Sequence, residues 1–403
     1  MNRTNDLKPH IGIFGRRNVG KSSFINKLAG QNIAIVSDIA GTTTDPVKKS
    51  FELIGFAPVV LIDTAGIDDT GELGIKRIEK TLKTIDIVDL AILIISSNNF
   101  GEFEEKLIKK FNECEVPFFI IHNKSDIEPL DEKLKQIITA KYKCEVIDFS
   151  NKIPQNFENI VEIIKNTIPE SSYRNVSMLK GLIKQGDIVL LITPIDLEAP
   201  EGRMILPQVQ AIRDILDNNC IAVVLKETEV ETFLNNTKIK PALAITDSQV
   251  FSFANSVIPP DVPLTSFSIM LAHHKGDFKN YIDGTKKINE LKDGDKVLIL
   301  ESCSHLISCD DIGRVKIPKW IKEYTGKNIS FKVIAGLDKL PDNIDDYALV
   351  IQCGGCMITK KQLHNRLRPF ILKDIAVSNY GMTIAYLKGI FNRAIEPFNK
   401  ING

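Results

Sequence analysis

Residues 11–22 have the sequence IGIFGRRNVGKS, and this stretch decides how the first part of the chain folds. Its first four residues are a short apolar strand pattern. The next eight match G-x-x-x-x-G-K-S, a loop whose backbone N–H groups surround phosphate oxygens. A helical stretch follows and ends near Leu28. A strand, this loop and a helix in that order begin a doubly wound α/β sheet. The residues near this loop that we expect to contact a nucleotide are Gly15, Asn18, Gly20, Lys21, Ser22 and Ser23.

A carboxylate and a glycine follow the next apolar strand pattern, in the sequence DTAG at residues 63–66. Asp63 stands where the carboxylate of a Mg²⁺ site belongs, and Ser22 supplies a hydroxyl ligand to the same ion. The backbone N–H of Gly66 is expected to contact the γ-phosphate, and Lys21 is expected to contact the β- and γ-phosphates. The alternative is that Asp63 is an ordinary polar residue at the end of a strand.

Residues 123–126 have the sequence NKSD at the end of another apolar strand pattern, and they resemble the N-K-x-D motif that binds guanine. Asp126 can accept hydrogen bonds from both N–H groups on one edge of guanine, which adenine does not present. Asn123 and Lys124 complete the base-binding loop. We therefore expect GTP to be the nucleotide, although these too could be ordinary strand-end residues.

Residues 41–45, GTTTD, resemble the first switch of the potassium-activated GTPases of tRNA modification and ribosome assembly. This resemblance implies that Thr43 ligates Mg²⁺ and takes part in catalysis, and that Asn18 contacts K⁺. Asn18 could instead only cap its turn. Ile67 follows the DTAG motif, where Ras-like GTPases carry a glutamine that orients water, and an apolar side chain cannot do this. We therefore expect slow hydrolysis that K⁺ stimulates, with K⁺ or a second protomer completing the catalytic site.

Composition narrows the possible partners and the compartment. The 403 residues predict two to four domains, and the 51 basic and 51 acidic side chains cancel, which argues against a nucleic acid partner. Residues 1–9 lack the apolar core of a signal peptide, and no apolar run is long enough to cross a membrane. The sequence predicts a cytoplasmic protein with reduced thiols. Cys114, Cys144 and Cys220 are isolated and are expected to pack as small core side chains.

Strand and helix patterns alternate through three segments of the chain. Residues 1–170 carry the nucleotide motifs on a doubly wound sheet. Residues 178–262 form a small α/β segment, whose size favours docking or self-association. Residues 263–403 predict another parallel α/β sheet, with a final helix over 382–395.

A thiol cluster lies in the third segment. Cys303 and His305 form a C-x-H pair, and Cys353 and Cys356 form a C-x-x-C pair, each directly after an apolar strand pattern. If these strands are parallel, both pairs lie at one edge of the sheet. Three thiolates with the imidazole could hold structural zinc, or three thiolates could hold a [4Fe–4S] cluster with one open iron, with His305 as a possible fourth ligand. Buried inert cysteines are the third alternative.

The three segments together resemble HydF, the family of [FeFe]-hydrogenase maturation GTPases, over essentially the full length of the chain. The resemblance is carried by the potassium-type nucleotide motifs, the small middle segment and the C-x-H…C-x-x-C pattern. Residues 193–196 (TPID) and 206–210 (LPQVQ) also resemble that family. Gln352 stands where the family commonly has a histidine before the C-x-x-C.

The resemblance implies a dimerisation domain at 178–262 and an iron–sulfur-cluster domain at 263–403, with a [4Fe–4S] cluster on Cys303, Cys353 and Cys356. It implies a homodimer that carries a transient two-iron precursor and transfers it to apo-[FeFe]-hydrogenase. Two radical S-adenosylmethionine maturases would act upstream, and GTP would act as a switch. The rival hypotheses are a potassium-activated GTPase of tRNA modification or ribosome assembly with a structural zinc site, and a metal-sensing switch protein without cargo.

Overall fold

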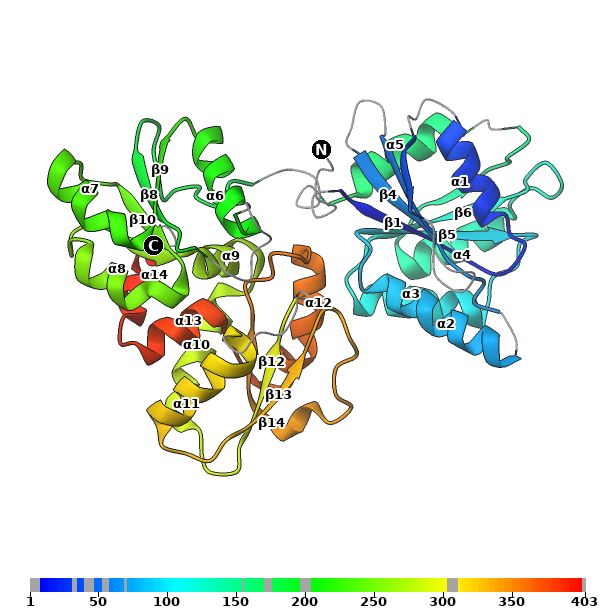
Figure 1. The fold of residues 1–403 in the computed structure, drawn as a ribbon. Helices are drawn as coiled ribbons and strands as arrows, with labels where there is room; N and C mark the ends of the chain where they lie inside the picture. Colours follow the sequence, from blue (N-terminus) through cyan, green and yellow to red (C-terminus); the bar gives the residue numbers. More distant parts are fainter. Residues whose placement is uncertain are drawn as a thin grey trace. The chain divides into compact units, whose positions relative to one another are not determined.

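The computed structural model describes residues 8–30, 35–39, 47–52, 58–68, 71–153, 156–169, 176–195, 204–302 and 311–400. The chain separates into two compact units, Met1–Asn175 and Val176–Gly403, which are traced in Figure 1. None of the helices in the described parts is both long enough and apolar enough to span a membrane.

The first unit contains a seven-stranded sheet with helices on both faces (Figure 1). The strand order is β2-β3-β4-β1-β5-β6-β7, in which β2 and β3 run antiparallel to their neighbours and the other pairs are parallel. The strands are β1 (His10–Phe14), β2 (Ile35–Ile39), β3 (Val47–Glu52), β4 (Pro58–Asp63), β5 (Leu90–Ser96), β6 (Phe118–Asn123) and β7 (Val146–Asp148). The helices are α1 (Lys21–Gly30), α2 (Gly71–Ile85), α3 (Glu102–Glu113), α4 (Glu132–Tyr142) and α5 (Phe157–Thr167).

The central strands are apolar at consecutive positions because both faces of this sheet are covered. Ile92 on β5 packs in a core with Phe24 of α1, whereas its neighbour Leu93 packs in a second core with Leu107 of α3. The doubly wound sheet predicted from the sequence is therefore confirmed. The antiparallel pair β2 and β3 was not predicted, because the VKKSFE sequence of β3 lacks a continuous apolar run.

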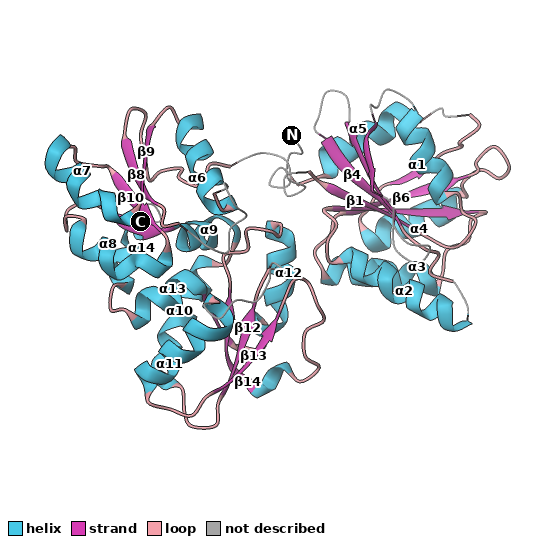
Figure 2. Cartoon of the chain, viewed as in Figure 1, coloured by secondary structure: helices cyan, strands magenta, loops and turns pink. Residues whose placement is uncertain are grey.

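The second unit contains two four-stranded sheets in which every neighbouring pair is parallel (Figure 2). The first has the order β11-β10-β8-β9 and the second β13-β12-β14-β15. The strands are β8 (Ile188–Ile192), β9 (Ile221–Leu225), β10 (Leu243–Thr246), β11 (Leu264–Ser266), β12 (Lys296–Leu300), β13 (Ser330–Ile334), β14 (Tyr347–Gln352) and β15 (Ala376–Asn379). The helices are α6 (Leu206–Asp217), α7 (Val230–Thr237), α8 (Phe251–Val257), α9 (Phe267–Lys275), α10 (Phe278–Lys286), α11 (Ile317–Thr325), α12 (Lys360–Ile371), α13 (Tyr380–Leu387) and α14 (Phe391–Asn399).

One apolar core joins the two sheets of this unit. It includes Leu190 of β8, Leu298 of β12 and Phe267 of α9, all of them buried. The small middle segment is therefore stabilised by its contacts with the C-terminal segment.

The C-terminal sheet is parallel, as the sequence predicts, but the single helix expected over 382–395 is wrong. Two helices, α13 and α14, occupy that region and extend beyond it. Gly389 lies between them with φ +74°, a left-handed conformation that typically ends a helix.

Strands β12 and β14 are neighbours, and Leu300 pairs with Gln352 at their carboxyl ends. The residues that follow these two strands therefore emerge at the same edge of the sheet. This register brings Ser302 to the Cys353 sulfur at that edge.

Candidate functional site

The loop between β1 and α1 has the conformation of a phosphate-binding loop. Gly20 has φ +95°, and a Cβ atom at this position would lie 2.3 Å from Nδ2 of Asn123, so that only glycine fits. Lys21 is buried, and its Nζ donates to the backbone oxygens of Gly15 at 3.1 Å and Arg16 at 2.7 Å. These contacts hold the ammonium group against the loop, where it can meet phosphate oxygens.

One backbone N–H group of this loop already donates a hydrogen bond to a carboxylate. The N–H of Arg17 donates to Oδ1 of Asp68 at 2.7 Å. Carboxylate and phosphate oxygens accept the same kind of hydrogen bond, so the Arg17 N–H faces a position that suits an anionic oxygen.

An ion pair fixes the same loop on α3. Nε and Nη2 of Arg16 donate to the two carboxylate oxygens of Glu104 at 2.7 and 2.8 Å. The Glu104 side chain is buried and also accepts from the N–H of Gly101, at the start of α3. A bidentate pair of this kind orients as well as attracts, so it limits the movement of the phosphate loop.

The two oxygen ligands expected for Mg²⁺ lie together. Oγ of Ser22 donates to Oδ2 of Asp63 at 2.6 Å. Hydroxyl and carboxylate oxygens are suitable ligands for Mg²⁺, so this pair fits the ion. Gly66 approaches the phosphate loop closely, since a Cβ atom there would lie 2.7 Å from the backbone N of Arg17. Thr43 lies outside the described residues.

The side chains of the NKSD motif join the base-binding region to the phosphate loop. Nδ2 of Asn123 donates to the backbone oxygen of Val19 at 2.8 Å. Nζ of Lys124 donates to the backbone oxygen of Asn18 at 2.7 Å. Asn123 and Lys124 therefore hold the phosphate loop in position.

Asp126 is held by Ser150, which stands in the sequence where the last guanine-binding loop belongs but matches that motif poorly. Oγ of Ser150 donates to Oδ1 of Asp126 at 2.6 Å, and the ammonium group of Lys152 lies 3.4 Å from Oδ2. The Ser150 hydroxyl, followed by Lys152, holds the pKa of Asp126 below its ordinary value. The carboxyl group is therefore ionised at neutral pH and can accept hydrogen bonds from guanine. Its position after β7 is the only sequence signal for Ser150.

Ile67 is buried in the apolar core beside β4. Its side chain therefore has neither the polarity nor the exposure to orient a water molecule for attack on the γ-phosphate.

In the second unit, Cys353 and Cys356 follow the carboxyl end of β14, and both are half-buried. The N–H of Cys353 donates to the oxygen of Leu300, so β12 and the C-x-x-C loop are directly bonded. Cys303 and His305 lie outside the described residues. Within the described ranges, which leave out 303–310, no three or more His, Cys, Asp or Glu side chains are grouped to hold a metal.

The sulfur of Cys353 contacts hydrogen-bonding groups from two strands. It accepts from the N–H of Ser302 at 3.1 Å, and Oγ of Ser302 also lies 3.1 Å away. Nε2 of the buried Gln352 donates to it at 3.3 Å. Donors of this kind stabilise a thiolate, which is the form that ligates metals.

The backbone of the C-x-x-C loop is held from α9 and β15. Nζ of Lys275 donates to the oxygens of Gly355 at 3.1 Å and Ile358 at 2.9 Å. Nδ2 of Asn379 donates to the oxygen of Gln352 at 3.3 Å. Gly355 has φ +67°, so this turn requires glycine or a strained side chain. A loop held in this way presents its two thiols in a fixed arrangement.

Arg366 was not singled out in the sequence, yet its guanidinium bonds the peptide group between Glu301 and Ser302. It lies on the buried face of α12, 6% exposed, and donates to the backbone oxygens of Glu301 at 2.6 Å and Ile334 at 3.1 Å. Arg366 shares one face of α12 with Leu363, Leu367 and Phe370, and an arginine among apolar residues at helical spacing predicts a buried charge. That signal was available in the sequence.

The remaining described cysteines are core residues. Cys114, Cys144 and Cys220 are all buried, which confirms the prediction. Burial raises the pKa of both the Cys114 and the Cys144 thiols to about 11, so they stay protonated and unreactive.

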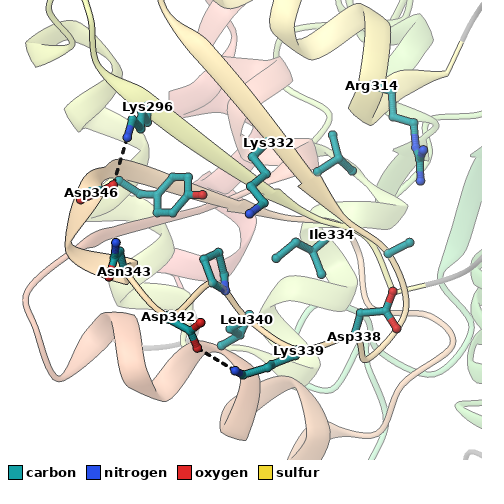
Figure 3. Close-up of a pocket in the computed structure, with 14 residues that line it drawn as sticks. Lys296, Arg314, Lys332, Ile334, Asp338, Lys339, Leu340, Asp342, Asn343 and Asp346 are labelled. Atoms are coloured by element: carbon teal, nitrogen blue, oxygen red, sulfur yellow. Dashed lines mark hydrogen bonds and ion pairs between the residues drawn. The ribbon is translucent and has the colours of Figure 1, made fainter.

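A separate cleft of about 770 Å³ lies beside β13 (Figure 3). Two ion pairs border it, one between Lys296 and Asp346 at 3.0 Å and the other between Lys339 and Asp342 at 2.7 Å. The Lys332 side chain, on β13, also lines it. No cysteine is among the described residues that line this cleft, so it is distinct from the thiol loop.

The first unit is similar in sequence to known GTPases. Residues 10–152 match the family model of the 50S ribosome-binding GTPase. GTPase Der of Wolinella succinogenes is 31% identical over 177 residues, which cover 43% of this chain and 34% of that protein. The tRNA modification GTPase MnmE of Nitrosomonas europaea is 37% identical over 127 residues, 31% of this chain and 28% of that protein. The chain thus spans about a third of the length of the curated relatives it matches. The solved structure of Aquifex aeolicus Era is 18% identical with a TM-score of 0.34, and the match covers 56% of this chain and 97% of that one.

The second unit matches two family models in succession. Residues 178–276 match the Hydrogen maturase F dimerization domain, and residues 279–397 match the Hydrogen maturase F tetramerization domain. With the GTPase model before them, these matches follow one another along nearly the whole chain. The order of the three domains and the thiol motifs agree with the resemblance seen in the sequence, and the chain belongs to the HydF family of hydrogenase maturation GTPases.

Proposed function

We propose that this protein is a scaffold for [FeFe]-hydrogenase maturation. It holds a [4Fe–4S] cluster, carries the two-iron precursor as cargo and transfers that cargo to the apo-hydrogenase. Its GTPase domain acts as a switch for these encounters, with GTP, Mg²⁺ and K⁺ bound. Two radical S-adenosylmethionine maturases are the proposed upstream partners.

The contact between Ser302 and Cys353 carries this proposal. The Ser302 N–H donates to the Cys353 sulfur at 3.1 Å, and Ser302 is the residue directly before Cys303. The residue that precedes the C-x-H motif therefore contacts the C-x-x-C loop, which supports the proposal of a site shared by Cys303, Cys353 and Cys356.

The chemistry of these residues fits an iron–sulfur cluster. Three thiolates would hold three irons, and His305 is a possible fourth or auxiliary ligand. When bound, such a cluster supplies an open iron to which the cargo can attach. The protein's own contribution is to hold the thiol loop rigid through Lys275 and Asn379 and to supply hydrogen-bond donors at Cys353.

Potassium is proposed to contact Asn18, which has φ +58° in the phosphate loop. The expected result is that GTP turnover of the wild-type protein is faster in KCl than in NaCl of equal ionic strength. In Asn18→Ala the ratio of the turnover rate in KCl to that in NaCl should fall about tenfold, because one coordinating oxygen is lost. Steady-state phosphate release measures both rates. Equal wild-type rates in the two salts would contradict the proposal.

Self-association through the middle segment is supported by the outer edge of β9. Ile221 and Val224 on this edge strand are 53% and 39% exposed, and no strand pairs with the outer side of β9 in the described part of the chain. An apolar unpaired strand readily pairs with another chain. We propose that two copies pair through β9 in a homodimer.

Iron and sulfide analysis after anaerobic purification tests the cluster. The wild-type protein should contain about four irons and four sulfides per chain, and Cys353→Ser should contain almost none, because a hydroxyl is a poor ligand for iron in such a cluster. Cys220→Ser is the matched control, since Cys220 is a buried cysteine of the same unit. Its iron content should equal that of the wild type.

Colourless wild-type protein with one zinc per chain would instead favour a structural zinc site. The transfer step is tested separately, by incubating loaded protein with apo-hydrogenase and measuring hydrogen evolution. Activation by the wild type and not by Cys353→Ser is the expected result.

A further inference from the structure

One peptide group connects a buried guanidinium to the Cys353 sulfur. Nη1 of Arg366 donates to the carbonyl oxygen of Glu301 at 2.6 Å. The N–H of that same peptide unit belongs to Ser302 and donates to the sulfur at 3.1 Å. Hydrogen bonds in series polarise one another, so the positive charge on Arg366 strengthens the donor that faces the sulfur.

Arg366 is a buried cation that has no carboxylate partner within the described parts of the chain. No Asp or Glu of the described residues lies within ion-pair distance of it, and its Nε has no hydrogen-bond partner there. The carboxylate of Glu301 is already bound by Arg314, at 2.9 to 3.3 Å. Burial lowers the pKa of Arg366. A cation in such a position is costly unless a negative group lies nearby.

Two side chains add further donors to the same sulfur. Nε2 of Gln352, which is fully buried, donates to the Cys353 sulfur at 3.3 Å and to Oγ of Ser302 at 2.9 Å. The Ser302 hydroxyl lies 3.1 Å from the sulfur and can donate to it once the thiol has lost its proton. The Gln352 amide nitrogen is thus engaged by both Cys353 and Ser302.

We propose that Ser302, Gln352 and Arg366 form an electrostatic cradle that stabilises negative charge on Cys353 and raises the reduction potential of the cluster bound there. This inference rests on the proposed function, because it requires the cluster. Reduction adds one electron to the cluster and breaks no bond, and that electron adds negative charge shared by the ligating sulfurs. Donors and a cation at one sulfur therefore favour the reduced form. In this chain the position before the C-x-x-C supplies a hydrogen-bond donor to a ligand.

The experiment is a dithionite titration of the reconstituted full-length protein, followed by the electron paramagnetic resonance signal of the reduced cluster. In Arg366→Met and in Gln352→Leu, the ratio of reduced to oxidised cluster at a fixed potential should fall at least about tenfold, which is 59 mV for a one-electron couple. Arg366→Lys keeps the charge and should shift the ratio much less. Gln352→Glu keeps the shape but replaces the donor by a carboxylate, and it should lower the ratio further than Gln352→Leu.

Arg393→Met is the matched control. Arg393 also donates to backbone oxygens, at Ile258 and Pro259, but its charge is not coupled to Cys353. The reduction potential of the cluster in Arg393→Met should equal that in the wild type. Unchanged potentials in all four cradle variants, with iron content intact, would overturn the inference while the proposed function stands. Wild-type protein without iron and sulfide would overturn both. If Arg366→Met does not retain iron, Gln352→Leu and Gln352→Glu give the deciding values.

Discussion

Asp126→Asn is expected to weaken GTP binding by about a thousandfold. The carboxylate accepts from two N–H groups of guanine, whereas an amide can accept from one and turns a donor towards the other. Ser150 holds the carboxylate in place, so the wild-type acceptor is positioned before the base arrives. Fluorescent-nucleotide titration measures the two dissociation constants.

Xanthosine triphosphate provides the matching control for this substitution. Xanthine has a carbonyl where guanine has an amino group, so the asparagine amide can donate to it, and the variant should bind this nucleotide more tightly than GTP. Ser150→Ala should weaken GTP binding by only about tenfold, because it removes one supporting hydrogen bond. If Asp126→Asn binds GTP within threefold of the wild type, Asp126 does not read the base.

Val224→Lys and Ile221→Lys together are expected to convert the proposed dimer to a monomer at micromolar concentration. Both side chains lie on the edge strand β9, and lysine on an edge strand prevents another strand from pairing with it. Desolvating two ammonium groups in an apolar interface should weaken association at least about a hundredfold. Light scattering coupled to size-exclusion chromatography measures the mass.

Ile137→Lys is the control for this change. Ile137 is also exposed, at 62%, but it lies on α4 in the first unit, away from β9 in the sequence. The mass of the Ile137→Lys protein in solution should equal that of the wild type. A double β9 variant that remains dimeric would show that the chain associates through another surface.

Much of the fold could be predicted because the relevant signals are local. The strand, loop and helix around Lys21 and the apolar run of β5 depend on residues next to one another in the sequence. The short edge elements were missed for the same reason. β15 has the sequence AVSN, and β11 has LTS, and neither carries enough apolar residues to be recognised without its neighbours.

In the candidate site, the sequence predicted only those residues whose side chains are typical ligands in a known motif. Three patterns indicate a ligand by their own side chains. They are the lysine that ends the glycine-containing phosphate loop, the aspartate after a strand, and the paired cysteines. Ser150 and Arg366 carry no such motif. They act through partners 24 and 65 positions away, and no local pattern encodes those contacts.

From its sequence alone, this chain is determined to be a nucleotide-binding α/β protein with a thiol motif, since spacing and side-chain chemistry are written directly in the order of residues. The tertiary structure decided which groups face the Cys353 sulfur. The pairing of Leu300 with Gln352 brings Ser302 to that sulfur, and the packing of α12 on the sheet brings Arg366 to the same peptide group. Such contacts arise from strand register and helix packing, which depend on the whole core and not on any one segment.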